Sequence, residues 1–187
     1  PSFDDYYEDI DFDASDDVFS CQGKEPATYA GFQEFWGDVN NLTVDGVYGK
    51  GRMASVCAVY GSNNAFMDSI KISNVHASCE LGANSVIRIA AGAGETPTTY
   101  QFGLIEISNV NAGRGLTQTL ASVRARDIRH YNIIDTYQAF AAFAESGTNI
   151  IDSYTIDTLR VKTTIGSGEA FAIALGPESG GTSTYGS

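Results

Sequence analysis

Two stretches of the chain carry nearly the same pattern of apolar and polar residues. Residues 70–77 read IKISNVHA and residues 105–112 read IEISNVNA, and the shorter stretches LTVDGV (42–47) and YTIDTL (154–159) fit the same register. In all four, the first, third and sixth places are apolar, and the second and fourth are mostly polar. Alternation with a period of two predicts a strand with one buried and one exposed face.

The fifth place of each stretch interrupts this alternation. It is occupied by Gly46, Asn74, Asn109 and Thr158. Glycine and asparagine tolerate the left-handed backbone of a sharp bend, and an asparagine can also bond to its copy in the next repeat. We therefore expect the chain to bend at this place in every repeat, and the asparagines to stack there.

A second set of short apolar runs alternates with the first. VCAVYG (56–61), VIRIAAG (86–92), FAAFAESG (140–147) and FAIALG (171–176) each close with glycine or Ser-Gly, and LASV (120–123) fits with them. Like elements recur about every 30 residues, a spacing typical of stacked repeats. One repeat is ambiguous, because its first strand could begin at Val123 (VRARDI) or near Tyr131 (YNIID).

The pattern predicts an all-β fold, a parallel β-helix (solenoid) of about five coils in which each coil buries its inward residues against its neighbours. An antiparallel sandwich is the alternative, but hairpin signals are nearly absent, Asp45-Gly46 being the one case. The stretch YQAFAAFAE (137–145) also fits a helical turn. We divide the chain into an acidic N-terminal arm with an aromatic cap (1–38), the coils (39–176) and a Gly/Ser/Thr-rich C-terminal tail or joint (177–187).

The I-x-I-x-N-V octets with their turn asparagine resemble the right-handed parallel β-helix superfamily, which includes polysaccharide lyases, polygalacturonases and bacteriophage tailspikes. The likeness covers residues 39–176, and its motifs are generic to that architecture. The acidic chain, irregular repeat lengths and the joint GPESGGTSTYGS (176–187) are most similar in style to tailspikes and related virion appendages. The resemblance implies a right-handed β-helix, usually a homotrimer, that lies on a virion or outside a cell and binds, and often cleaves, a host surface polysaccharide.

Charge is concentrated at one end of the chain. Of the 187 residues, 43% are hydrophobic and 18% charged, which is typical of a folded domain rather than a disordered chain. Nine of the 23 acidic residues lie in residues 1–25 against one base, Lys24, so most of the net charge of −12 belongs to this segment. The remainder is nearly neutral and has no basic stripe, which argues against nucleic-acid binding. No stretch approaches the roughly 20 apolar residues that a membrane span needs.

Stacked coils should align their exposed side chains in rows about 4.8 Å apart. The second-place row is predicted to hold Thr43, Lys71, Glu106 and Thr155, and the fourth-place row Asp45, Ser73, Ser108 and Asp157, with Arg124 and Arg126 joining the two rows if the ambiguous coil begins at Val123. Glycan cleavage needs two carboxylates, or a base beside a charge-neutralising group. Glu106 and Asp157 are therefore the candidate catalytic residues. The alternative is a solvated ladder of opposite charges, which contributes little to stability.

The candidate glycan-binding residues combine cations with aromatic rings. Lys71, Arg124 and Arg126 belong to the predicted rows. The segment YAGFQEFW adds Tyr29 and Trp36, whose rings can stack on sugars. The aromatic residues of this segment also fit one face of a helix, so it is alternatively a cap over the open end of the solenoid.

No metal site or cofactor is predicted. The acidic start DIDFDASDD (9–17) suggests calcium ligands, but Ala14 stands where an EF-hand loop needs glycine, and Ser20 where it needs a closing glutamate. Its alternating apolar residues instead fit a strand with one acidic face, or a solvated arm. His76 and His130 have no metal-ligand spacing and are expected at surface or turn positions. The three cysteines are expected to be small buried hydrophobes.

Three functions remain open at this stage. The first is a virion or cell-surface adhesin that binds host polysaccharide, and the second is a glycan-cleaving enzyme, lyase or hydrolase, that uses Glu106. The third is a purely structural solenoid subunit without a ligand. About five coils is few for an enzyme of this superfamily, which favours a binding or a structural role.

Overall fold

The computed structural model describes residues 6–14, 19–22, 37–51, 56–79, 85–91, 96–114, 116–136, 142–144, 148–161, 175–177 and 182–185. Within these residues the regular structure consists of β-strands, with no helix. The strands form one sheet of nine strands and one of six. The predicted all-β class is therefore confirmed.

Each sheet collects one of the two sets of repeats. The larger sheet contains β1 (Tyr6–Ala14), β4 (Thr43–Gly51), β7 (Ile70–Cys79), β9 (Phe102–Arg114), β11 (Arg124–Thr136), β13 (Thr148–Val161) and β15 (Thr182–Tyr185), with the short strands β3 (Val39–Asn40) and β6 (Met67–Asp68) beside them. The smaller sheet contains β2 (Phe19–Gln22), β5 (Cys57–Gly61), β8 (Ser85–Ala91), β10 (Leu116–Ala121), β12 (Ala142–Ala144) and β14 (Leu175–Pro177).

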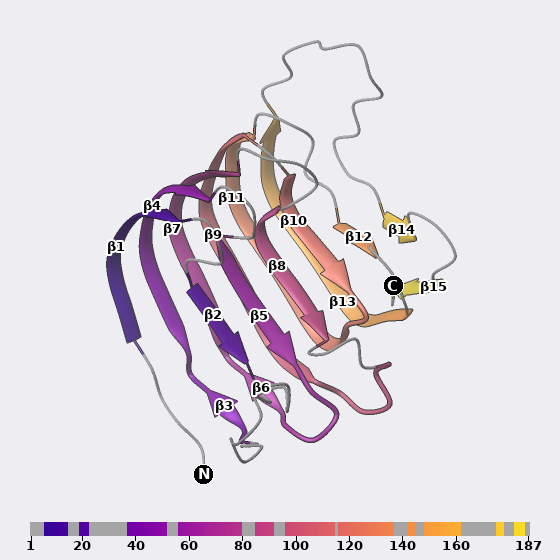
Figure 1. The fold of residues 1–187 in the computed structure, drawn as a ribbon. Helices are drawn as coiled ribbons and strands as arrows, with labels where there is room; N and C mark the ends of the chain where they lie inside the picture. The colour runs from indigo at the N-terminus through magenta and orange to yellow at the C-terminus, as the bar shows by residue number, and fades with distance from the viewer. Residues whose placement is uncertain are drawn as a thin grey trace.

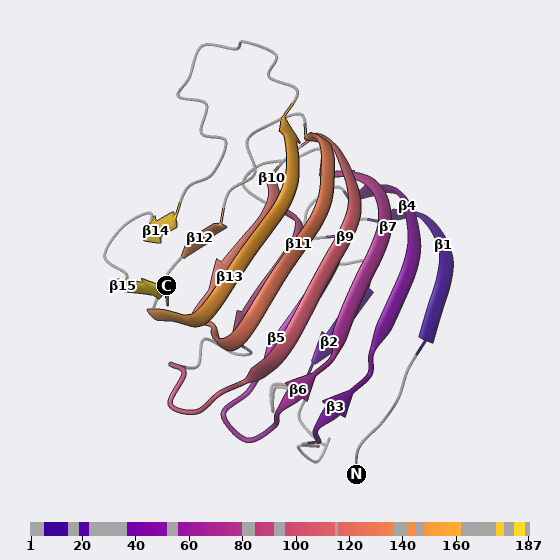
Figure 2. The ribbon, with the colours of Figure 1, turned by 180° about the vertical axis from the view of Figure 1, so that it is seen from behind.

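The chain passes back and forth between the sheets, and its strands are parallel. After β4 it enters the smaller sheet as β5, returns as β7, and repeats this alternation through β8, β9, β10 and β11. All pairings between these described strands are parallel. The larger sheet curls around the smaller one (Figure 1), and its long strands lie side by side when seen from behind (Figure 2). An antiparallel sandwich is thereby excluded.

The stretch 137–145, for which a helical turn was the alternative, contains β12. Its residues 142–144 form a strand paired with β10 and β14, and the rest of the stretch lies outside the described residues. At the other end of the chain, β1 pairs with β4 and β2 with β5. The strand ladder therefore includes part of the acidic start, and the strand predicted there is confirmed for residues 9–14.

The core lies between the two sheets. The first, third and sixth places of the octets point into it and are fully buried: Ile70, Ile72, Val75, Ile105, Ile107 and Val110. Val59, Ile87 and Ile89 of the smaller sheet belong to the same apolar cluster. Burying each such side chain contributes about 1.5–3 kcal/mol. Cys57 is buried in this cluster, as predicted, whereas Cys21 is only partly buried and packs against it.

The bend at the fifth place has the predicted left-handed backbone. The φ angle is 80° at Gly46, 55° at Asn74, 54° at Asn109, 52° at Asn132 and 62° at Thr158. Positive φ costs most residues about 1–2 kcal/mol, and glycine and asparagine adopt it most readily. The repeated bend therefore explains why glycine or asparagine occupies four of these five positions.

The stacked side chains Asn74, Asn109 and Asn132 form the predicted asparagine ladder. The amide nitrogen of Asn109 donates to the Oδ1 atom of Asn74 at 3.1 Å, and that of Asn132 donates to Asn109 at 2.8 Å. Asn74 donates in turn to the Asp45 carboxylate at 2.6 Å. The first two ladder steps span 35 and 23 residues, so the repeats keep one register although their lengths differ.

The ambiguous coil has a register that neither predicted start gives. Ile128 pairs with Ile105, and Ile133 with Val110, so the octet runs IRHYNIID from residue 128. β11 covers both VRARDI and YNIID, but the first place is neither Val123 nor Tyr131. The pattern was hidden because a histidine, His130, occupies the third place where the other repeats have an aliphatic residue.

His130 is a core residue, which corrects the prediction of a surface or turn position. It pairs with Ile107 on one side and Ile156 on the other, is fully buried, and lies 5.2 Å from the ring of Tyr154. Burial lowers its pKa from 6.5 to about 3, because the charged imidazolium is poorly solvated there. His76 is exposed as predicted and stacks on Tyr48 at 5.5 Å.

Substitution of Asn109 tests the ladder. Alanine at this position loses both ladder hydrogen bonds and keeps a Cβ atom in left-handed backbone, so we expect the free energy of unfolding to fall by about 2 kcal/mol. Asn109→Gly relieves the backbone cost while removing the same bonds, and should lose about half as much. Urea denaturation measures both, and equal stability of wild type and Asn109→Ala would contradict the role of the ladder.

Acid should destabilise the fold through His130. The unfolded chain takes up a proton on this histidine near pH 6.5, whereas the folded chain does so only near pH 3, so stability is complete above pH 6.5 and falls as the pH is lowered below it. Between pH 7 and pH 5 we expect a loss of about 2 kcal/mol from this group.

Denaturation of His130→Leu measured over the same pH range should lack this part of the slope. His76→Gln removes the other histidine, which is exposed, and should retain it. A wild-type slope that His130→Leu leaves unchanged would show that the buried histidine does not control the acid response.

Candidate functional site

The outer face of the larger sheet presents the two predicted rows of polar side chains. The second-place row is Thr43, Lys71, Glu106, Arg129 and Thr155, and the fourth-place row is Asp45, Ser73, Ser108, Tyr131 and Asp157. The predicted members from the four clear repeats are all in place. Arg129 and Tyr131 take the positions predicted for Arg124 and Arg126, because the ambiguous coil begins at Ile128.

Glu106 has a cation next to it on each side in the second-place row. Its register neighbours are Lys71 on β7 and Arg129 on β11. Arg129 is already engaged, because its Nε and Nη2 atoms lie 2.7 Å and 2.5 Å from the Asp127 carboxylate. This hydrogen bond raises the pKa of Arg129.

The two candidate catalytic carboxylates lie on the same face but not side by side. Asp157 is two strands from Glu106 and in the neighbouring row, which puts their Cα atoms about 12 Å apart for the usual strand spacing and rise. Glycosidases hold their two carboxyl groups about 5–9.5 Å apart. Asp157 is exposed and accepts a hydrogen bond from the hydroxyl of Thr158 at 3.2 Å.

A second group of side chains gathers where the strands of the larger sheet begin. We call it the arginine–tyrosine cluster: Phe66, Tyr100, Arg124, Arg126 and Asp152. The guanidinium of Arg124 lies 4.7 Å from the centre of the Tyr100 ring. That of Arg126 lies 5.4 Å from the same ring and 5.3 Å from the ring of Phe66. The Tyr100 hydroxyl donates to Asp152 at 2.6 Å, and this bond raises the pKa of the tyrosine.

Hydrogen bonds from Asn63 fix the segment that carries Tyr100. The side-chain oxygen of Asn63 accepts from the backbone N–H of Thr98 at 2.8 Å, and its amide donates to the carbonyl of Thr96 at 2.9 Å. The carbonyl of Thr98 accepts from the Nη1 atom of Arg124 at 3.0 Å. Asn63 thus anchors the segment that leads to Tyr100 and that accepts a hydrogen bond from Arg124.

Gly103 makes room for the rest of the cluster. A Cβ atom there would overlap the Asp68 carboxylate and would lie 3.0 Å from the edge of the Phe66 ring. Asp68 uses this space to accept backbone hydrogen bonds from Ser69 at 2.9 Å and Leu104 at 2.8 Å. The absence of a side chain at residue 103 therefore leaves room for the Phe66 ring, over which Arg126 lies.

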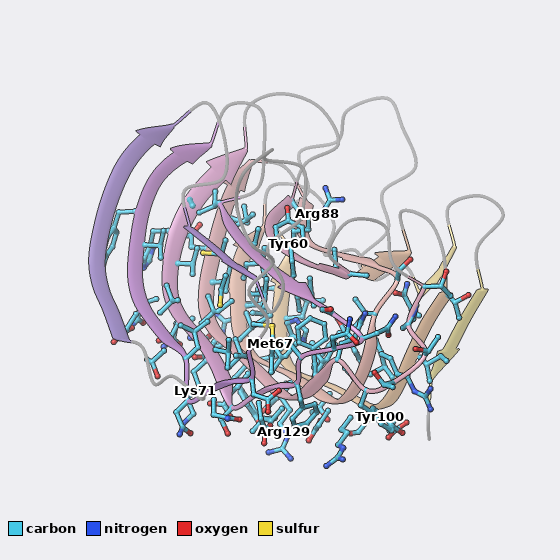
Figure 3. All side chains as sticks on the ribbon, turned by 60° about the horizontal axis from the view of Figure 1, so that its bottom comes forward. Tyr60, Met67, Lys71, Arg88, Tyr100 and Arg129 are labelled. Atoms are coloured by element: carbon cyan, nitrogen blue, oxygen red, sulfur yellow. The ribbon has the colours of Figure 1, made fainter. Side chains whose placement is uncertain are left out.

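The predicted binding residues have separate positions in this arrangement. Arg124 and Arg126 are together in the cluster, whereas Lys71 is an exposed member of the second-place row. Figure 3 shows Lys71, Arg129 and Tyr100 pointing away from the sheet, and Met67 pointing toward the interior. Tyr29 and Trp36 lie outside the described residues.

Sequence reasoning missed Phe66, Tyr100 and Asp152. These three lie just outside the octets, and each is within two residues of a buried residue that pairs across the strands: Met67, Phe102 and Ile151. An alignment of the residues that precede each octet would have placed these three residues near one another and near Arg124 and Arg126. The two arginines were the signal in the sequence that a charged site lies at this end of the strands.

Neither a metal-binding cluster nor a membrane-spanning helix is found in the described part of the chain. It contains no group of three or more His, Cys, Asp or Glu side chains placed to hold a metal ion. No helix in that part is long and apolar enough to span a membrane.

A scan against protein-family models finds no match to this chain, and searches of curated proteins and of solved structures find none either. The side-chain chemistry of the outer face is therefore the basis for assigning a function.

Proposed function

We propose that this protein is a right-handed parallel β-helix that binds a host surface polysaccharide, as an adhesin of a virion or cell surface and as a homotrimer or part of a larger assembly. The alternation of the chain between two parallel sheets supports the β-helix. The resemblance of the octets to that superfamily supports the surface location and the assembly.

The arginine–tyrosine cluster is the observation that carries the binding proposal. It brings cations, aromatic rings and a carboxylate from four separate segments onto an outer face of the sheet. Guanidinium groups donate hydrogen bonds to sugar oxygens and to acidic groups, and carboxylates accept hydrogen bonds from sugar hydroxyls. The bonds through Asn63 hold the cluster in place before a ligand arrives, which reduces the entropy lost on binding.

Fewer observations support the two alternative functions, a glycan-cleaving enzyme and a purely structural solenoid. A glycan-cleaving enzyme is favoured by the position of Glu106 between two cationic neighbours, but its candidate partner Asp157 lies two strands away in the neighbouring row, not beside it. A purely structural solenoid would need no cluster of this kind. We therefore place binding first, cleavage second and a structural role third.

A panel of capsular and O-antigen polysaccharides separates these functions. We expect at least one polysaccharide to bind without new reducing ends, as measured by calorimetry and an end-group assay. Tyr100→Ala removes the ring that both arginines contact, and should weaken binding at least about tenfold, or about 1.4 kcal/mol. Tyr48→Ala is the matched control, because Tyr48 is an exposed tyrosine that stacks on His76, outside the cluster.

The other outcomes assign the function differently. New reducing ends that Glu106→Gln abolishes would make the protein an enzyme. No binding to any member of the panel would leave a structural role. If Tyr100→Ala and Tyr48→Ala change the binding affinity equally, the polysaccharide does not bind at the arginine–tyrosine cluster.

A further inference from the structure

Arg126 is held by two aromatic rings. Its guanidinium carbon lies 5.3 Å from the centre of the Phe66 ring and 5.4 Å from that of Tyr100. The side chain is exposed, and among the described residues no hydrogen bond or ion pair engages it. A guanidinium is attracted to the faces of aromatic rings even at exposed sites, so the two rings limit the movement of this otherwise flexible side chain.

The neighbouring arginines differ from Arg126 in this respect. Arg124 donates to the carbonyl of Thr98, and Arg129 donates to Asp127. Each therefore spends part of its hydrogen-bonding capacity within the protein. Arg126 keeps its N–H donors for an acceptor that comes from outside.

A planar guanidinium with available donors matches a carboxylate. Two parallel N–H groups can donate to the two oxygens of one carboxylate, which gives a strong and directional contact. The acceptor must also tolerate nearby negative charge, because Asp152 lies opposite Arg126 in the strand register. A singly charged carboxylate is repelled less by Asp152 than a phosphate of charge near −2.

Asp152 itself supplies the complementary group. One of its oxygens, Oδ2, accepts from the Tyr100 hydroxyl, and the other can accept from a sugar hydroxyl. A ligand residue that carries both a carboxylate and a free hydroxyl would satisfy Arg126 and Asp152 together.

We propose that the cluster recognises an acidic sugar, with the carboxylate of a uronic-acid residue bound to Arg126 and a hydroxyl of the same residue bound to Asp152. This inference rests on the proposed polysaccharide binding and specifies its substrate class. The protein's net charge of −12 repels polyanions at long range, so binding depends on the local contact and not on general electrostatic attraction.

The test compares acidic polysaccharides with their neutral counterparts. Alginate and hyaluronate are titrated into the whole chain, each beside a carboxyl-reduced form with the same backbone, and dextran sulfate represents the sulfate ester. We expect at least one uronate polymer to bind tenfold or more tightly than its reduced form and than dextran sulfate. Arg126→Gln should abolish this preference, and Arg126→Lys, which keeps the charge without the planar pair of donors, should restore only part of it.

Arg160→Gln is the matched control, because Arg160 is an exposed arginine of β13 outside the cluster; it should bind as the wild type does. Thermal melting of every variant establishes that it is folded. Equal binding of acidic and reduced polymers, or binding that Arg126→Gln leaves unchanged, would overturn this inference. If neutral polysaccharides of the earlier panel still bind, polysaccharide binding stands and only the preference for an acidic sugar is wrong. If no polymer binds, both proposals are wrong.

Discussion

The in-register stacking of parallel strands is the constraint on which the rest of the structure depends. The left-handed bend at Asn74, Asn109 and Asn132 recurs at one place in each repeat, and the side-chain amides connect one bend to the next. A slip of one residue would move every isoleucine of an octet from the core to solvent. The buried aliphatic columns and the asparagine ladder therefore select the same register independently.

Stacking also separates the parts of the chain that are free to vary from those that are not. The ladder steps of 35 and 23 residues show that differences in coil length are accommodated between the strands without altering the register. Side chains on the outer face can change identity at little cost, as Lys71 and Glu106 do at equivalent positions. Long connections such as the segment held by Asn63 then add groups to that face, and the arginine–tyrosine cluster is formed in this way.

Much of the fold could be predicted from the sequence, because alternation with a bend residue has a direct physical cause. The four clear octets, the buried places and the asparagine ladder all follow from it. The coil containing His130 could not be aligned, since a buried histidine breaks the apolar pattern and only Asn132 marks the bend. For the site, Arg124 and Arg126 were named, but their position relative to Tyr100 depends on hydrogen bonds between residues more than 30 positions apart, which no local pattern encodes.

The register of β11 against β9 is the most direct test of this account, because both the buried position of His130 and the composition of the outer rows follow from it. Interstrand nuclear Overhauser effects in the uniformly labelled protein measure it. The account predicts backbone contacts that connect Ile128–His130 with Ile105–Ile107. Contacts that instead connect the segment 123–125 with Ile105–Ile107 would contradict it, and would return Arg124 and Arg126 to the rows that Arg129 and Tyr131 occupy.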